Sequence, residues 1–151
     1  MTTSAEDTAR AVWDLYNEMT TDLAVEHANA EFKGVDIDDG WDEIPARVST
    51  AQAQLEALAH EKSSRNEHRH ARAVKGDLGE LYNALVERSA SQVNFLTVEA
   101  SVKEVMAEGG SGDMVGLDLA RDRLDKAVQR MASDQSSLLY DLENLNADLK
   151  S

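Results

Sequence analysis

Apolar side chains recur every three or four residues along most of this chain, which is the spacing of one face of an α-helix. The pattern predicts a first helix over about residues 5–31, opened by a capping box of Thr3 and Glu6. The period breaks over residues 32–41. Glycine and aspartate predict an irregular connection there, and its apolar residues are expected to pack onto the end of the protein.

A second helix is predicted over about 42–70, with Pro45 in its first turn, where a missing N–H group is tolerated. Its apolar face stops early, and the chain is polar and basic over residues 60–75. Either the helix continues there as a solvated end, or the chain turns near residues 63–66. A third helix is predicted over about 77–108, after glycines that mark a weak break. One continuous helix through both segments is the alternative.

The fourth predicted helix, over about 113–150, has the most regular pattern. Two interleaved rows repeat every seven residues, which is the heptad pattern of helices that pack as coiled coils. Arg121 and Gln135 interrupt one row, and the glycine-rich segment 109–112 predicts a flexible link before the helix. The first row is Leu117, Leu124, Met131, Leu138 and Leu145, and the second is Met114, Arg121, Val128, Gln135, Leu142 and Leu149.

These elements predict an all-α protein with one domain over residues 1–151. We expect an antiparallel bundle of three or four long amphipathic helices, compact or elongated, with a coiled-coil-like C-terminal helix. The composition agrees, because proline occurs once and Phe, Tyr and Trp together number seven, whereas strands favour aromatic and β-branched residues. The chain has no cysteine, which excludes disulfides, thiolate metal sites and cysteine nucleophiles.

The net charge is −14. Such a surface repels nucleic acid phosphates, so we expect no direct nucleic acid binding. The acidity serves solubility or salt adaptation, or else it is aimed at a basic partner. No run of about 20 apolar residues is present, and the N-terminus lacks the pattern of a signal peptide. We therefore expect a cytoplasmic or virion-internal protein that does not enter membranes.

Acidic residues gather over residues 36–43, and oxygen-rich loops bind calcium. An EF-hand that began at Asp36 would place Gly40 at its third ligand position and Trp41 where glycine is required. A turn followed by the acidic start of a helix explains the cluster better. Its members are Asp36, Asp38, Asp39, Asp42 and Glu43.

A second cluster combines histidine with glutamate and contains one E-x-x-H step, which di-iron bundles use. Those bundles need a second such step and two more carboxylates, and the arginines of this segment oppose metal binding. We therefore expect no metal and no cofactor. The members are His60, Glu61, Glu67, His68 and His70.

Two surfaces are candidates for partner binding. The segment 60–75 holds five Lys or Arg and two Glu, a local charge of +3. It either pairs with acids on a neighbouring helix or contacts an acidic partner, which includes another copy of this chain. On the last helix, the shorter first helix is expected to leave one end uncovered for another chain. The candidate residues are Arg65, Arg69, Arg72, Lys75, Leu142, Leu145 and Leu149.

No hydrolase elbow, P-loop or dinucleotide motif is present. We expect a non-enzymatic interaction or assembly protein that forms homo-oligomers, such as a scaffold, an adaptor or, by analogy of class, a virion component. The first alternative is an acidic inhibitor that occupies a basic, nucleic-acid-binding surface of a target protein. The second is a metal-binding helical-bundle enzyme.

Overall fold

The computed structural model describes residues 4–61 and 65–150, and the side chains of residues 65–68 lie outside that description. The secondary structure of these residues is helical, without strands. Five α-helices in this part of the chain pack against one another, which confirms the all-α prediction. They are α1 (Ala5–Met19), α2 (Leu23–Lys33), α3 (Ile44–Ala59), α4 (Arg65–Ala107) and α5 (Met114–Lys150), and a short 3₁₀ helix, η1 (Trp41–Glu43), precedes α3.

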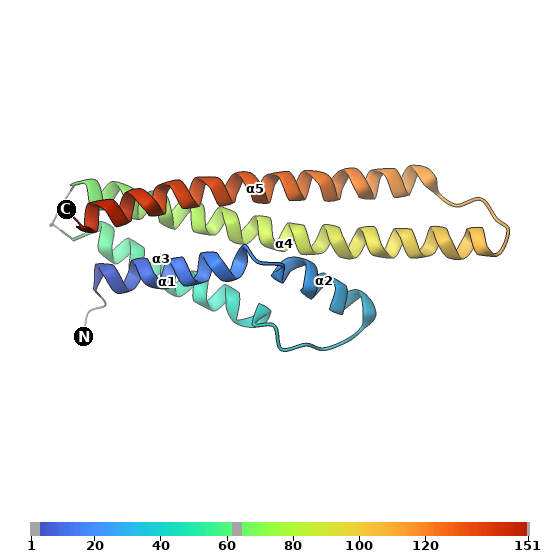
Figure 1. The fold of residues 1–151 in the computed structure, drawn as a ribbon, viewed down its shortest axis with the longest axis horizontal. Helices are drawn as coiled ribbons and strands as arrows, with labels where there is room; N and C mark the ends of the chain where they lie inside the picture. Colours follow the sequence, from blue (N-terminus) through green and yellow to red (C-terminus); the bar gives the residue numbers. More distant parts are fainter. Residues whose placement is uncertain (1–3, 62–64, 151) are drawn as a thin grey trace.

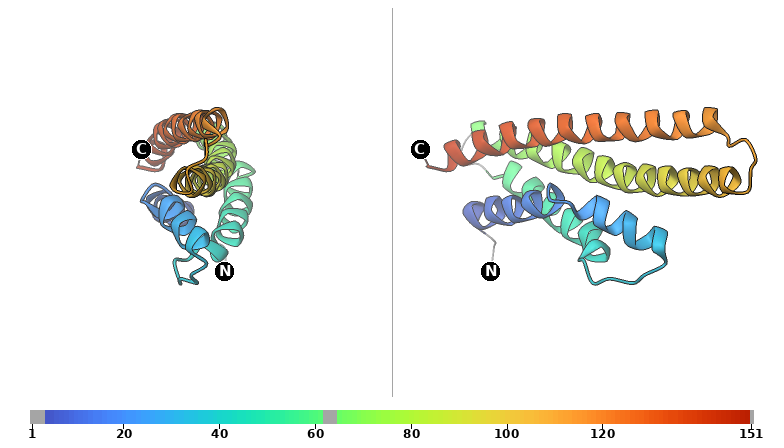
Figure 2. Two further views of the ribbon diagram at one scale, coloured as in Figure 1. Left: turned by 90° about the vertical axis from the view of Figure 1, so that its right-hand side faces the viewer. Right: turned by 45° about the vertical axis from the view of Figure 1, so that its right-hand side comes forward.

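Two long helices, α4 and α5, set the shape of the molecule. They have 43 and 37 residues. At 1.5 Å per residue they extend for about 65 and 55 Å. They run antiparallel and side by side (Figure 1). The shorter helices α1, α2 and α3 cover one end and the middle of this pair, and the other end extends beyond them (Figure 2).

The single helix predicted over residues 5–31 is interrupted. The Thr20 hydroxyl donates to the Asn17 carbonyl at 3.4 Å, and the Thr21 hydroxyl donates to the Glu18 carbonyl at 2.8 Å. Side chains that bind nearby backbone carbonyls in this way compete with the next helical turn. The interruption separates α1 from α2, so that α2 lies along the middle of α4 (Figure 1).

Local capping explains where α1 begins and where α2 ends. The Ser4 hydroxyl accepts a hydrogen bond from the backbone N–H of Asp7 at 3.1 Å, as an N-cap does. Thr3 of the predicted capping box lies outside the described residues. At the other end, Gly34 has a φ of 69°, the left-handed conformation in which glycine commonly closes a helix.

The break predicted before residue 77 is wrong, and so is the single continuous helix. Helix α3 ends at residue 59 and α4 begins at residue 65, and the alternative turn predicted near residues 63–66 lies partly outside the described residues. Gly76 and Gly79 lie inside α4. A Cβ atom at Gly79 would lie 2.9 Å from Nε2 of Gln52, and that amide donates to the Lys75 carbonyl at 3.3 Å. Gly79 therefore lies against the Gln52 side chain of α3, inside the helix.

The core lies where α1, α2 and α3 cover the long pair. The expectation that Leu142, Leu145 and Leu149 stay uncovered is wrong. Leu142 and Leu145 are fully buried, and Leu149 is half-buried against the same core, because α1 also packs on this part of α5. The largest buried side chains of the core are Val12, Leu15, Met19, Ile44, Leu55, Val74, Leu78, Leu81, Leu85, Leu138, Leu142 and Leu145.

Candidate functional site: an uncovered helical arm

The far end of the α4–α5 pair is left open by the other described helices (Figure 1). We define the arm as residues 92–130, which comprise the last part of α4, the connection and the first part of α5. Along the arm, which the structure describes throughout, only Val102, Leu117, Ala120 and Ala127 are buried. The three α5 residues recur at helical spacing on the face that α5 turns toward α4. The arm is thus two helices thick with a narrow core.

One heptad row of α5 changes from exposed to buried along the helix. Met114 is 51% exposed and Val128 is 43% exposed, and Arg121 between them is also exposed. Farther along the same row, Leu142 is fully buried and Leu149 is half-buried. Residues seven apart share one face of the helix. In the C-terminal part of α5 that face is covered by α1, but in the arm no other described helix lies over it (Figure 1).

Helix α4 adds two apolar residues to the same side of the arm. The guanidinium group of Arg121 lies 5.9 Å from the centre of the Phe95 ring, within cation–π range, so Phe95 lies beside the exposed row. Met106 follows eleven residues later, about three helical turns, and shares that face of α4. Met106 is 57% exposed. We call these two residues together with Met114, Arg121 and Val128 the arm seam.

The opposite side of the arm is dominated by ion pairs. Arg123 Nε lies 3.4 Å from Glu87 Oε1, and Lys126 Nζ lies 3.1 Å from Asp122 Oδ2. Leu119 is exposed among these charged residues. Val115, one turn before Leu119 on the same side of α5, is also exposed. This side therefore combines two exposed apolar residues with ion pairs, whereas the seam continues from α5 onto α4 through Phe95 and Met106.

The basic residues of segment 60–75 lie in different environments in the structure. Lys75 Nζ lies 3.0 Å from Glu56 Oε2 on α3, so Lys75 forms an internal ion pair. Its hydrogen bond lowers the pKa of the Glu56 carboxyl below the ordinary value. Arg69 and Arg72 are exposed near the start of α4, at the end opposite the arm, and the side chain of Arg65 lies outside the described residues. The structure does not bring these cations to the seam.

Two histidines of the predicted histidine–glutamate cluster pair with carboxylates on different helices. His60 Nε2 lies 2.9 Å from Glu56 Oε1, and His70 Nδ1 pairs with the Asp148 carboxylate on α5. The side chains of Glu67 and His68 lie outside the described residues. Among the residues whose side chains are described, no cluster of three or more His, Cys, Asp or Glu could hold a metal ion.

The acidic segment 36–43 is tied to α2 through one of its members. Asp39 Oδ2 lies 3.0 Å from Nδ1 of His27, and Asp39 Oδ1 accepts a hydrogen bond from the backbone N–H of Trp41 at 3.0 Å. The rings of His27 and Trp41 stack with their centres 4.2 Å apart. Asp39 thus anchors the turn. The other carboxylates are exposed. Of the four apolar side chains expected to pack there, Trp41 packs against the core, whereas Phe32, Val35 and Ile37 are exposed.

A cluster of three carboxyl groups between α4 and α5 was not anticipated from the sequence. Burial raises the pKa of Asp77 to about 7, with further contributions from a hydrogen bond to Asp141 and from the charges of Asp141, Asp134 and Glu80. One carboxyl oxygen each of Asp77 and Asp134 is buried without a hydrogen-bond partner. The nearest cation to Asp134 is Arg130, whose Nε lies 3.7 Å away. Asp134 and Asp141 are seven residues apart and so share one face of α5, which is the sequence feature that could have pointed to this cluster.

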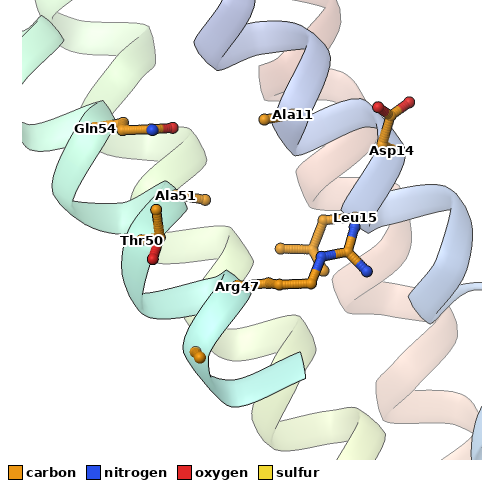
Figure 3. A pocket seen from close by; sticks show the side chains of 8 residues that line it. Ala11, Asp14, Leu15, Arg47, Thr50, Ala51 and Gln54 are labelled. Atoms are coloured by element: carbon orange, nitrogen blue, oxygen red, sulfur yellow. The ribbon is translucent and has the colours of Figure 1, made fainter. Parts of the chain in front are cut away.

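Figure 3 shows a groove between α1 and α3. The small side chains of Ala11 and Ala51 leave a volume of about 340 Å³ above Leu15. The lining contains no histidine, lysine or cysteine. The Asp14 carboxylate and the Thr50 hydroxyl point away from each other. The groove therefore offers no arrangement of nucleophile and base.

No protein-family model, curated protein or solved structure matches this chain. Within the described part of the chain, no helix combines the length and the apolar character needed to cross a membrane. The features that bear on function are therefore those of the structure itself. Among them, the arm seam places exposed apolar side chains from two adjacent helices on one side of the arm.

Proposed function

We propose that this chain is a non-enzymatic assembly protein that binds another protein chain through the arm seam and forms homo-oligomers. The observation that carries the proposal is the change along one heptad row of α5. Leu142 is fully buried in the core that α1 helps to form, whereas Met114 and Val128 on the same face are about half exposed. A mostly apolar heptad row that is covered at one end of a helix and open at the other favours a second helix from elsewhere as the missing cover.

The fold that accompanies this proposal is a bundle formed by α1, α3, α4 and α5, from which α4 and α5 continue as an antiparallel coiled coil. The heptad rows of α5 support this interpretation, since they persist from the core into the arm. Scaffolds, adaptors and virion-type structural components present such helices to their partners. The functional class is proposed by analogy of architecture, and the partner is inferred from the exposed surface.

Self-association can be measured on the purified chain by light scattering coupled to size-exclusion chromatography. We expect a wild-type mass of two or more chains that falls toward one chain on dilution. Val128→Lys places a charge in the seam and should yield the monomer. Leu119→Lys is the matched control, because Leu119 is exposed nine residues earlier, two and a half turns away, and so lies on the opposite side of α5.

The control should keep the wild-type mass, and circular dichroism should show the same helicity in all three proteins. A wild-type chain that stays monomeric up to several hundred micromolar would contradict the proposal. Equal loss of association in Val128→Lys and Leu119→Lys would show that the seam is not the binding surface.

A second candidate function is the acidic inhibitor of a basic protein surface. The exposed connection between α2 and α3 supports it, because Asp36 and Asp38 alternate there with Val35 and Ile37, and all four side chains are exposed. Acidic and apolar groups together suit a basic surface that also has apolar patches. This candidate requires competition with nucleic acid for a target. Replacing Asp36 and Asp38 by Asn should then weaken the competition while leaving the mass of the chain unchanged.

A further inference from the structure

The arm seam raises the question of which chain covers it. Resting on the proposed assembly function, we propose that the cover is the arm of a second copy in antiparallel orientation, with the tip of each arm beside the root of the other. The tip is defined as residues 97–118, and the root as residues 92–96 and 119–130. The body is the remainder of the chain.

Charge is distributed so that the arm is the place where two copies can approach. The arm has seven acidic and five basic residues, a net charge of −2, whereas the body has 22 acidic and 10 basic residues, a net charge of −12. Two bodies side by side would repel each other strongly. At physiological ionic strength the Debye length is about 8 Å, so moving the bodies to opposite ends of a joined pair of arms largely removes that repulsion.

The charge within the arm favours the antiparallel orientation. The tip has five acidic residues and one basic residue, a net charge of −4, and the root has two acidic and four basic residues, a net charge of +2. A parallel pair would place two acidic tips together and both bodies at one end. An antiparallel pair places each acidic tip against a basic root, which is the arrangement of complementary potentials that selects an orientation.

The seam residues of α5 match this arrangement. Met114 and Val128 lie seven residues before and seven residues after Arg121. In an antiparallel pair centred on Arg121, Met114 of one copy therefore packs against Val128 of the other. The two Arg121 side chains, both in the roots, then meet at the centre, and the tip of each α5 lies against the part of the other root beyond Arg121. Each lies 3.6 Å from its own Asp118, which offsets the repulsion between them. A polar residue within an apolar seam restricts register and orientation.

The available area suits a reversible dimer. At 1.5 Å per residue the arm helices are about 25 Å long, and two helices side by side are about 20 Å wide. One side of the arm therefore offers an area of about 500 Å² per copy, or about 1,000 Å² in total for a dimer. Specific interfaces begin near that total area, and transient ones have areas close to it. Monomer and dimer should therefore interconvert on dilution.

Cysteine cross-linking distinguishes the orientations, because the chain has no cysteine of its own. Met114→Cys and Val128→Cys are prepared separately with tags of different mass, mixed in equal amounts and oxidised. Positions 114 and 128 are about 21 Å apart along α5. A disulfide needs Cα atoms within about 7 Å. An antiparallel pair should therefore give a mixed 114–128 dimer as the main covalent product, whereas Leu119→Cys should stay uncross-linked.

Homodimers of each single variant without the mixed product would overturn the antiparallel arrangement and leave the assembly function in place. A wild-type dimer by light scattering that gives no cross-link at either position would show that another surface joins the copies. A wild-type monomer would refute the proposed function and this inference together.

Discussion

Leu124 and Leu138 test the difference between the arm and the core, because they belong to the same heptad row of α5 and can be changed identically. Leu138 is fully buried in the core, whereas Leu124 is half-buried in the arm. Truncating a fully buried leucine to alanine costs roughly 2.7–5 kcal/mol, since a cavity adds to the lost transfer free energy. Leu138→Ala should therefore lower the free energy of unfolding by about 3–4 kcal/mol.

Leu124→Ala should cost much less. The change removes three carbon groups at about 0.8 kcal/mol each, and half-burial reduces the transfer term to about 1.2 kcal/mol without a closed cavity. For a chain of this size each kcal/mol moves the melting temperature by about 2–4 °C. Leu138→Ala should thus lower it by about 6–16 °C, and Leu124→Ala by about 2–5 °C.

The assay is equilibrium urea unfolding followed by circular dichroism. Both variants are made in the Val128→Lys background, because a dimer would bury Leu124 further and would make the apparent stability depend on concentration. Losses of equal size, or a larger loss at Leu124, would refute the view that the arm lacks cover within one chain.

Two further predictions concern α4. Asp77 binds its proton more tightly in the folded chain than in the unfolded chain, because its pKa is raised. As the pH rises from about 4 to about 7, the unfolded chain loses this proton first, so the free energy of unfolding falls. Asp77→Asn should melt higher than wild type at pH 8 and depend less on pH, and identical profiles of melting temperature against pH would contradict this reasoning. Gly76→Ala should stabilise the chain by up to about 1 kcal/mol in urea unfolding, because alanine favours a helix interior. No atom lies within 4 Å of the added Cβ. Destabilisation would indicate a helix break at this residue.

The helical class and the last helix followed from local pattern. The prediction of 113–150 differs by one residue at its start from the observed helix, Met114–Lys150. Periodicity and the glycine-rich link suffice there, because both act through neighbours in sequence. The interruption after α1 was also local, but it depends on two threonine hydroxyls that bind carbonyls of the preceding turn, and the apolar period continues across it.

The wrong break before residue 77 has a different cause. Glycine weakens a helix in isolation, and the sequence pattern therefore favoured an end at Gly76 and Gly79. In the folded chain Gly79 lies against Gln52 of α3, where a larger side chain would have to displace the amide. The contact joins residues 27 positions apart in sequence, so no local pattern contains it.

The same limit applies to the binding surface. Met114, Val128, Leu142 and Leu149 occupy equivalent positions of one heptad row, and the pattern alone cannot rank them. Helix lengths alone predicted that the uncovered end lies at Leu142, Leu145 and Leu149. In the structure α1, α3 and α4 form a core around the C-terminal part of α5, in which Leu142 is buried, while Met114 and Val128 stay open. Periodicity determines which face of a helix is apolar, whereas burial depends on which other helix lies against that face.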